Sequence, residues 1–364
     1  MDPRFEQAKA FFLQGAAHYE AGRYAEAERA FAASLSLVPD RPSTLANLGA
    51  VRLKLGRTDD AIELLREALA RDPQHVQAHG HLAAALADEG RPAEALPVAV
   101  RSTELDPANV AGWVLRGTLE RELGQRESAR ASFQQALERG ADPHLVGYFL
   151  AAVSQEVPPA PPRQYVEQLF DGYEAEFEQH LRETLQYRAP EILAEGLARP
   201  RYDAVLDLGC GTGLCAPLLR PRAGRLDGVD LSAAMVERAR AGGLYDEVVQ
   251  ADLAEHLAST PQRYDLLVAA DVFIYVGALE RVFEGAARVL RPGGGFAFSA
   301  EAADEHHTIE LRLSLRYAHS ERYIRMLAGQ YGFELRATAR HPLRIDRGQP
   351  LPGLFAWLTR TGSA

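Results

Sequence analysis

The clearest pattern along the chain is a set of small residues and prolines that recurs every 34 residues in its first part. Three positions of the repeating unit hold glycine or alanine, and a fourth holds proline. These residues are Gly15, Gly49, Ala83 and Gly117; Gly22, Gly56, Gly90 and Gly124; Ala27, Ala61, Ala95 and Ala129; and Pro39, Pro73 and Pro107. Four positions that keep one strict period indicate an internal repeat.

Each repeat is predicted to be a pair of helices. The first helix ends near the second glycine of the set, because glycine adopts the left-handed turn that closes a helix. The second helix carries the alanine, packs closely, and stops before the proline. Segments such as AGRYAEAERAFAASLSLVPD resemble the tetratricopeptide repeat over roughly residues 8–143, with Ala141 in place of the last proline. The resemblance implies an α-solenoid whose groove binds a peptide or partner protein; a spacer or dimerisation element is the alternative.

A proline-rich run separates these repeats from the rest of the chain. Residues 144–156 are interpreted as one more helix that caps the stack. The run Val157-Pro158-Pro159-Ala160-Pro161-Pro162 cannot be helical, and it makes a stiff, extended spacer. We therefore place the repeat domain at residues 1–156, the linker at 157–163 and a second domain at 164–364.

Short apolar runs alternate with helical stretches in the second domain. After a helical segment at 164–198, we expect strands at 204–208, 226–230, 247–250, 264–270, 295–299, 334–341 and 354–359, and helices near 214–221, 232–241, 278–290 and 320–331. This alternation predicts a parallel sheet with helices on both faces. The last two strands follow each other closely, which indicates an antiparallel hairpin at one edge.

Charge and composition narrow the classes of partner. The chain has 40 Lys+Arg against 50 Asp+Glu, a net charge of -10, which disfavours nucleic acids and anionic membranes as partners. No apolar run approaches the ~18 residues that span a bilayer, and no signal peptide is recognised. Cys210 and Cys215 stand too close for a favourable bridge, so we expect a reduced, cytoplasmic protein.

A glycine-rich turn follows the first predicted strand, in the run Asp207-Leu208-Gly209-Cys210-Gly211-Thr212-Gly213. Glycines there let the backbone approach a ligand at the carboxyl ends of the strands. Asp230 ends the second strand and can accept bonds from both hydroxyls of a ribose. Asp252 and Asp271 follow the third and fourth strands at the same edge. NAD(P) binding is the alternative, but the dinucleotide pattern requires a third glycine where Leu214 stands.

The full series is similar to the class I S-adenosylmethionine-dependent methyltransferases over roughly residues 164–360. The matching segments are LDLGCGTG, GVDLS with Met235, QADL, AADVFIYV and LRPGGGFAFS. The resemblance implies a Rossmann-like fold in which the glycine turn and Asp207 hold the methionine moiety of S-adenosylmethionine, Asp230 holds the ribose and Asp252 reads the adenine. The implied cofactor-binding residues are Asp207, Gly209, Cys210, Gly211, Gly213, Asp230, Leu231, Met235, Asp252, Leu253 and Asp271.

The chain as a whole resembles predicted methyltransferases that carry tetratricopeptide repeats. The segments LFDGYEAEFEQHLRETLQYRAP and RYAHSERYIRMLAGQYGFEL match those that such proteins place before and after the core. This family resemblance implies no particular substrate.

Methyl transfer is an in-line displacement in which positioning does much of the work, and a base is needed only when the acceptor loses a proton. The candidate catalytic residues are His319, which can titrate near neutrality, and Asp271. Each has a structural alternative: a histidine bonded to backbone at a helix start, and an aspartate that shapes its loop or touches cofactor. The candidate substrate residues are Tyr173, Tyr187, Arg188, Tyr275, Arg316 and Tyr317. We expect no metal site, and interpret His306-His307 as part of a solvated loop.

Three functions remain open after these steps. The first is O-methylation of a small, carrier-borne or peptide-borne acceptor, with the repeats recruiting substrate or partner. The run Asp271-Val272-Phe273-Ile274-Tyr275 lacks the prolines of enzymes that methylate amide or base nitrogens, which favours small metabolites. The second is a protein methyltransferase whose repeat groove holds the polypeptide. The third is a repeat-based adaptor with a non-catalytic cofactor site.

Overall fold

The computed structural model describes residues 2–171, 187–346 and 348–362. The chain folds into two compact units, Met1–Ser154 and Gln155–Ala364, and each is described on its own. Within the described ranges, none of the helices combines the length and the apolar character that a bilayer crossing requires.

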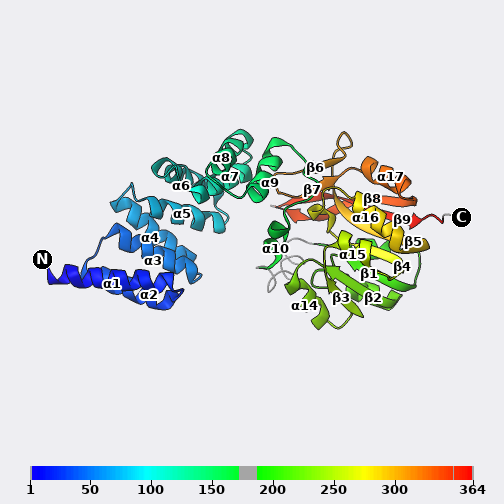
Figure 1. The fold of residues 1–364 in the computed structure, drawn as a ribbon, viewed down its shortest axis with the longest axis horizontal. Coiled ribbons are helices and arrows are strands. Elements are labelled where there is room, and N and C mark those ends of the chain that lie inside the picture. Colours follow the sequence, from blue (N-terminus) through cyan, green and yellow to red (C-terminus); the bar gives the residue numbers. More distant parts are fainter. Residues whose placement is uncertain (1, 172–186, 347, 363–364) are drawn as a thin grey trace. The chain divides into compact units, whose positions relative to one another are not determined.

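The first unit is made of helices that stack in pairs (Figure 1). The pairs are α1 (Pro3–Glu20) and α2 (Tyr24–Leu37), α3 (Pro42–Lys54) and α4 (Thr58–Arg71), α5 (Val76–Asp88) and α6 (Pro92–Leu105), and α7 (Val110–Glu122) and α8 (Arg126–Glu138). The helix α9 (Pro143–Ser154) follows and packs on α8. The predicted helical repeats are thereby confirmed. Gly22, Gly56, Gly90 and Gly124 close the first helix of each pair with φ between 66° and 75°, as a left-handed turn requires.

The small residue in the middle of each first helix makes room for a large one on the second helix. A Cβ atom built on Gly15 would lie 2.8 Å from the ring of Phe31, and one on Gly117 would lie 2.7 Å from the ring of Phe133. The third repeat has Ala83 at the equivalent position, and its partner 16 residues later is Ala99. A large residue on the second helix is thus accommodated where the first helix has glycine, and alanine on the first helix faces alanine on the second.

The described strands of the second unit form one nine-stranded sheet with the order β3-β2-β1-β4-β5-β7-β6, in which β9 pairs with both β5 and β8. Neighbouring strands from β3 to β5 are parallel, whereas β9 runs antiparallel to β5 and β8. The strands are β1 (Tyr202–Leu208), β2 (Ala223–Asp230), β3 (Glu247–Gln250), β4 (Tyr264–Ala269), β5 (Leu290–Ala302), β6 (Ile309–Leu311), β7 (Tyr317–His319), β8 (Phe333–Asp346) and β9 (Gln349–Arg360).

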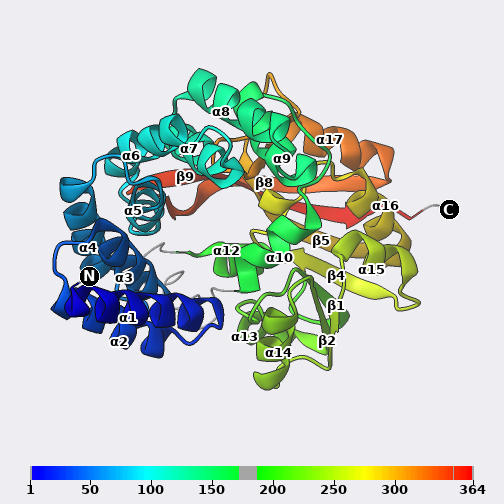
Figure 2. The ribbon, with the colours of Figure 1, turned by 60° about the vertical axis from the view of Figure 1, so that its left-hand side comes forward.

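The helices of the second unit cover both faces of this sheet, as predicted. Among the described residues they are α10 (Arg163–Asp171), α12 (Ala189–Glu195), α13 (Ala216–Leu219), α14 (Ala233–Ala241), α15 (Leu253–Ser259), α16 (Glu280–Val289) and α17 (Glu321–Gln330), with short 3-10 turns η2 (Arg220–Arg222) and η3 (Phe273–Tyr275). Figure 2 shows β1, β2, β4 and β5 side by side. Leu206 packs in one core with α15, α16 and α17, and the next residue back, Val205, packs in the opposite core with α12 and α13. Successive side chains that point into two different cores are typical of a strand that is buried on both faces.

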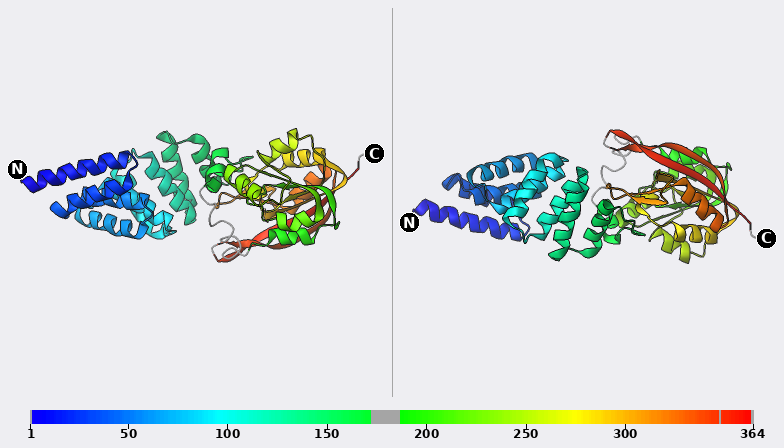
Figure 3. Two further views of the ribbon diagram at one scale, coloured as in Figure 1. Left: turned by 90° about the horizontal axis from the view of Figure 1, so that it is seen from below. Right: turned by 90° about the horizontal axis from the view of Figure 1, so that it is seen from above.

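The antiparallel hairpin predicted at the end of the chain is present as β8 and β9, drawn in red tones in Figure 3. The sequence did not predict β6, β7 or α15. The strands β6 and β7 are three residues each, which is too short to show a periodicity. Among the described strands, β7 pairs with the far end of β5 and with β6.

Within the second unit, part of the proline run is held against β7 and the loop before α16. The carbonyl oxygen of Pro158 accepts a hydrogen bond of 2.9 Å from Tyr317 Oη, and that of Pro159 accepts one of 2.8 Å from the amide of Ala278. A Cβ atom on Gly277 would lie 2.6 Å from the Pro159 oxygen. Glycine at position 277 therefore lets the proline run lie directly on the loop before α16.

Candidate active site

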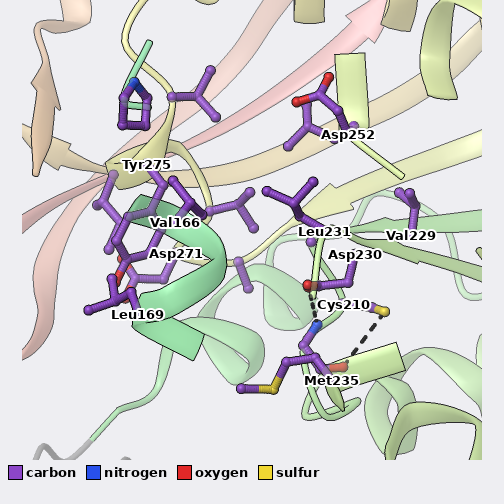
Figure 4. Close-up of a pocket in the computed structure, with 18 of the residues that line it drawn as sticks. Val166, Leu169, Cys210, Val229, Asp230, Leu231, Met235, Asp252, Asp271 and Tyr275 are labelled. Carbon is purple, nitrogen blue, oxygen red and sulfur yellow. Dashed lines mark hydrogen bonds between the residues drawn. The ribbon is translucent and has the colours of Figure 1, made fainter. Parts of the chain in front are cut away.

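A cavity of about 660 Å³ lies at the carboxyl ends of β1, β2, β3 and β4. The end of β1 contributes Gly209–Thr212 and the end of β2 contributes Val229–Leu231. The far wall comes from the loop after β4, with Val166 and Leu169 of α10. Figure 4 shows the two sides, with Asp230, Cys210 and Met235 on one side and Asp271, Tyr275, Val166 and Leu169 on the other.

The glycine turn has the geometry of a cradle for a ligand. Gly209 and Gly211 have φ of 63° and 55°. A Cβ atom on Gly209 would lie 2.6 Å from Val272, whereas one on Gly211 would meet nothing within 4 Å. Thr212 lines the cavity, and its hydroxyl is buried and has no partner among the described residues. An open backbone and a hydroxyl without a partner fit the methionine end of the cofactor that the sequence implies.

Asp230 is held in place at the end of β2 by two backbone amides. Its Oδ2 accepts from the amide of Gly211 at 2.8 Å, and its Oδ1 accepts from that of Ser232 at 3.0 Å. Burial raises the pKa of this carboxyl, and the amide bonds oppose the rise. A carboxylate with two accepted bonds keeps lone pairs for the two hydroxyls of a ribose. This donor set fits an adenosyl cofactor.

Asp252, Leu231, Leu253 and Met235 surround the remaining part of this side of the cavity. Asp252 caps α15, since its Oδ1 accepts from the amides of Ala254 and Glu255 at 2.9 and 3.0 Å. Met235 is buried, and its amide is bonded to the hydroxyl of Ser232. Apolar side chains beside one fixed carboxylate suit an adenine ring, whose faces are apolar and whose amino group is a donor.

Asp207 lies beneath the glycine turn and does not line the cavity. It is 1% exposed, and its Oδ2 accepts a hydrogen bond of 2.6 Å from the hydroxyl of Tyr245. Burial raises the pKa of Asp207 to about 7, opposed by the bond from Tyr245. Gly213, also outside the lining, packs against the ring of Tyr245. Both residues thus support the turn from behind, and the sequence carried no signal for Tyr245.

Asp271, a candidate from the sequence, lines the cavity after β4 with a φ of 56°. Its amide donates to the hydroxyl of Ser299 at 2.8 Å, and its Oδ2 pairs with the guanidinium of Arg344 on β8. Its Oδ1 is buried and has no partner among the described residues. Burial raises the pKa of Asp271, and the positive charges of Arg344 and Arg316 oppose the rise. The ion pair with Arg344 and the amide bond to Ser299 therefore hold the loop of Asp271 at the cavity wall.

The predicted substrate residues divide into three groups. Tyr187, Tyr275 and Arg316 line the cavity, while Arg188 and Tyr317 do not; Tyr173 lies outside the described residues. Burial raises the pKa of Tyr275, and the nearby, hydrogen-bonded guanidinium of Arg316 opposes the rise. Burial also raises the pKa of Tyr187 well above its usual value. Both phenols are thus neutral hydrogen-bonding groups.

His319, the other candidate base, does not face the cavity. It is the last residue of β7, is 0% exposed, and its Nε2 lies 2.8 Å from the carbonyl oxygen of Gly277. Burial lowers its pKa to about 4. The following Ser320 caps α17. The position thus matches the alternative of a histidine bonded to backbone at a helix start.

Sequence reasoning did not identify several residues of the wall, among them Arg344, Val166 and Leu169. The spacing of Val166 and Leu169 along one helix face was the available signal. Arg344 meets Asp271 across 73 residues of chain, and no local pattern connects them. No cluster of metal-binding side chains occurs among the residues that the structure describes, and His306 is 93% exposed.

Comparisons with known proteins match both units. A methyltransferase domain family matches residues 205–294, and tetratricopeptide repeat families match residues 6–74, 47–110 and 110–140. The malonyl-[acyl-carrier protein] O-methyltransferase of Enterobacter lignolyticus is 32% identical over 142 residues, which are 39% of this chain and 55% of that protein. The ubiquinone biosynthesis O-methyltransferase of Klebsiella pneumoniae is 32% identical over 99 residues, 26% of this chain and 41% of that protein.

The chain thus spans about half, or less, of the length of these curated relatives. Among solved structures, the N-methyltransferase NodS of Bradyrhizobium japonicum in complex with S-adenosyl-L-homocysteine aligns with a TM-score of 0.43 and 17% identity, over 54% of this chain and 98% of that chain. The order of the matched families along the chain, repeats first and the methyltransferase domain after them, agrees with the order predicted from the sequence. The chain thus has segments that match tetratricopeptide repeats and, after them, a segment that matches a methyltransferase domain.

Proposed function

We propose that this protein transfers a methyl group from S-adenosylmethionine to an oxygen atom of a small, carrier-borne or peptide-borne acceptor. The observation that carries the proposal is a single cavity in which the glycine turn and Asp230 share one space with Asp271, Tyr275 and Arg316. A cofactor and an acceptor can therefore meet without bulk water between them. The two relatives described above are named O-methyltransferases, which supports oxygen as the acceptor atom.

S-adenosylmethionine supplies an electrophilic methyl group on a sulfonium sulfur. The chain supplies position: the amides of Gly211 and Ser232 fix the carboxylate of Asp230, which binds the ribose. Leu231, Met235 and Asp252 line this side of the cavity, where Leu231 and Met235 would enclose the adenine and Asp252 would orient its amino group. Holding both reactants in line is worth a large part of the barrier in reactions of this type.

On the acceptor side, Val166, Leu169 and Val272 exclude water, and Tyr275 and Arg316 orient the acceptor. Asp271, which lines the same wall, would hold the acceptor or the ammonium group of the cofactor through its carboxylate. Where the acceptor is a hydroxyl, Asp271 is the group placed to take its proton. His319 has no part in this step, because it is buried away from the cavity.

The repeats are proposed to recruit the acceptor or the protein that carries it. This division keeps residues 1–156 as the recruiting domain and residues 164–364 as the catalytic domain, joined by the linker at 157–163. Tetratricopeptide repeats stack into extended binding surfaces, which is the property this role needs. The exposed side chains of Lys9 and Leu13 on α1 are suited to test it.

Calorimetric titration with S-adenosylhomocysteine tests the cofactor site. Wild-type protein should bind, Asp230→Ala should bind at least about tenfold more weakly because it loses the ribose contacts, and the surface control Glu334→Gln should match wild type. No binding by folded wild-type protein would remove the methyltransferase proposal. Binding without turnover in an acceptor screen would favour the adaptor.

The repeat variant separates the two enzymatic functions. Lys9→Ala with Leu13→Ala should leave methylation of a free small acceptor unchanged and weaken methylation of a carrier-borne one. If the pair abolishes methylation of polypeptides and no small acceptor is found, the protein methyltransferase replaces our proposal.

A further inference from the structure

One wall of the cavity comes from the end of the proline run and the helix that follows it. Ala160, Pro161 and Arg163 line the cavity, together with Val166 and Leu169 of α10. Each side chain of α10 that the structure describes is half-buried or exposed, and that of Leu169 is 39% exposed. This helix therefore faces the cavity with part of its surface and solvent with the rest.

The wall segment is attached at its beginning to β7 and to the loop before α16. The carbonyl oxygen of Pro158 accepts from Tyr317 Oη at 2.9 Å, and that of Pro159 accepts from the amide of Ala278 at 2.8 Å. We call these two hydrogen bonds the latch. A Cβ atom on Gly277 would lie 2.6 Å from the Pro159 oxygen and 2.9 Å from the Pro158 oxygen. Because Tyr317 is 0% exposed, its hydroxyl is a donor in a fixed position.

At its other end the wall segment reaches the adenosyl side of the cavity. The helix α10 packs on α14, and Arg163 at its start pairs with Glu167 at 2.8 Å. The hydrogen bond to Glu167 and the negative charges of Glu255 and Asp252 raise the pKa of Arg163. Glu255 and Asp252 belong to the lining on the adenosyl side. Residues 158–169 therefore run from the latch to the adenosyl side, and we call them the strap.

The strap is stiff where it leaves the latch. Pro158, Pro159, Pro161 and Pro162 are four of its first five residues. Proline has a fixed φ and no amide hydrogen, so such a run stays extended and attaches to its surroundings through its carbonyl oxygens. The latch uses two of these oxygens. A displacement at the latch is therefore transmitted along the run to the start of α10.

We propose that the strap closes the cavity over the bound cofactor, and that Tyr317 is a positioning residue that controls exchange of the cofactor by holding the strap in place. The proposal rests on the function proposed above, because it takes the cavity as the site of S-adenosylmethionine. The sequence predicted that Tyr317 contacts the substrate. Its side chain does not line the cavity, so it acts on the ligand through Pro158.

A latch made only of protein groups has a kinetic signature. Weakening it favours the open strap in the free protein and in the complex alike, because neither hydrogen bond involves the ligand. The ligand then enters and leaves more often, while its affinity stays nearly the same, as long as the closed strap remains the main form. A change that damages the binding residues themselves lowers the affinity instead.

The test uses full-length protein and radiolabelled S-adenosylhomocysteine, whose association and dissociation rates are measured separately. Tyr317→Phe removes one hydrogen bond of the latch, so both rates should rise about fivefold, with Kd within about twofold of wild type. Gly277→Ala displaces the Pro159 oxygen and should raise both rates at least as much. Bound S-adenosylhomocysteine should also slow proteolysis between residues 155 and 162 in wild-type protein, because the closed strap is the form that contacts it.

Tyr264→Phe is the matched control. The Tyr264 hydroxyl donates to Asp227 Oδ2 at 3.1 Å in another buried hydrogen bond, and neither residue lines the cavity. This variant loses a comparable bond, so it should be less stable than wild type but exchange the ligand at wild-type rates. Tyr317→Phe keeps the ring and serves alone if Gly277→Ala fails to fold.

The outcomes separate the strap from the function it rests on. Wild-type exchange rates in Tyr317→Phe, weaker binding without faster association, or an equal acceleration in Tyr264→Phe overturns the strap proposal and leaves the methyltransferase function standing. Failure of folded wild-type protein to bind S-adenosylhomocysteine removes the methyltransferase function, and the strap proposal with it.

Discussion

The hydroxyl of Tyr245 donates a hydrogen bond of 2.6 Å to Oδ2 of Asp207, directly beneath the glycine turn. The ring of the same tyrosine packs on Gly213, where an added Cβ atom would lie 3.2 Å away, and on Gly228. Burial raises the pKa of Asp207 to about 7, and the bond from Tyr245 opposes that rise. Tyr245 therefore links the ionisation of Asp207 to the shape of the turn that approaches the cofactor.

Tyr245→Phe should destabilise the second unit more at high pH than at low pH. The lost bond stabilised the ionised form of Asp207, so its pKa rises further. Above pH 7 the loss should be about 2 kcal/mol, as for a bond to a charged group, and below pH 6 about 1 kcal/mol. Urea unfolding followed by the fluorescence of Trp357, in a Trp113→Phe background, measures it.

Asp207→Asn provides the matching control for that experiment. The unfolded chain ionises Asp207 near its ordinary pKa of 3.8 and the folded chain only near 7, so wild-type stability falls as the pH rises between these values. The asparagine variant should lack this slope. An equal loss for Tyr245→Phe at pH 5.5 and 8.5 would contradict the link to Asp207.

Gly277→Ala should loosen the proline run from β7 and the loop before α16. The added Cβ would lie 2.6 Å from the Pro159 oxygen and 2.8 Å from the ring of Tyr317, so either the run or the loop must move. We expect a loss of about 1–3 kcal/mol, typical of overpacking, and faster proteolysis between residues 155 and 162. Limited proteolysis followed by mass spectrometry measures the second effect.

The control for this change is Gly329→Ala on α17, where an added Cβ meets nothing within 4 Å. Alanine is the better helix former there, so this variant should be as stable as wild type or slightly more stable. Tyr317→Phe, which removes the bond to Pro158, should raise proteolysis of the same segment without the steric effect. Cleavage at the wild-type rate in both Gly277→Ala and Tyr317→Phe would show that these contacts do not hold the run.

The fold was accessible to sequence reasoning where the pattern is long or strict. The period of 34 residues located the helical pairs, because a glycine with positive φ closes the first helix at the same place in each of the four repeats. The apolar runs located the parallel strands, since strands buried on both faces are nearly continuous in apolar residues. By contrast, β6 and β7 are three residues each and exist only because β5 extends beyond β4.

The cofactor side of the site was predictable because its residues follow consecutive strands, and the carboxyl ends of parallel strands meet at one edge. The remaining relationships join distant segments. Tyr245 reaches Asp207, and Arg344 reaches Asp271, through the packing of the sheet, so no local spacing indicates either pair. The sequence shows that residue 319 is a histidine, which can act as a base, but it does not show that this side chain is buried.

Gly117→Ala should destabilise the fourth repeat through a clash with Phe133. The added Cβ would lie 2.7 Å from two ring atoms, and overpacking of this kind costs about 1–3 kcal/mol. Gly147→Ala on α9, where a Cβ meets nothing within 4 Å, is the control. The third repeat holds Ala83 and Ala99 at these positions, so the added Cβ should cost less in a Phe133→Ala background than in the wild-type background.

Unfolding of the first unit, followed by Trp113 fluorescence in a Trp357→Phe background, measures the coupling between positions 117 and 133. We expect the Gly117→Ala/Phe133→Ala double variant to be more stable than the sum of the two single losses predicts, because loss of the Phe133 ring frees the volume that the alanine at position 117 needs. Strict additivity would mean that the two positions do not share one volume.

His319→Gln should change the acid stability of the protein and leave the pH profile of methyl transfer unchanged. Burial lowers the pKa of His319 to about 4, so the unfolded chain takes up the proton near pH 6.5 while the folded chain does not. Wild-type stability therefore falls as the pH drops from 6.5 toward 4, by about 3 kcal/mol from this group. Glutamine can donate to the same Gly277 carbonyl but does not titrate, so the variant should lose less stability over this range. Urea unfolding at pH 7 and pH 4.5 measures the difference, and a pH–rate profile whose acid limb disappears in the variant would instead make His319 the base.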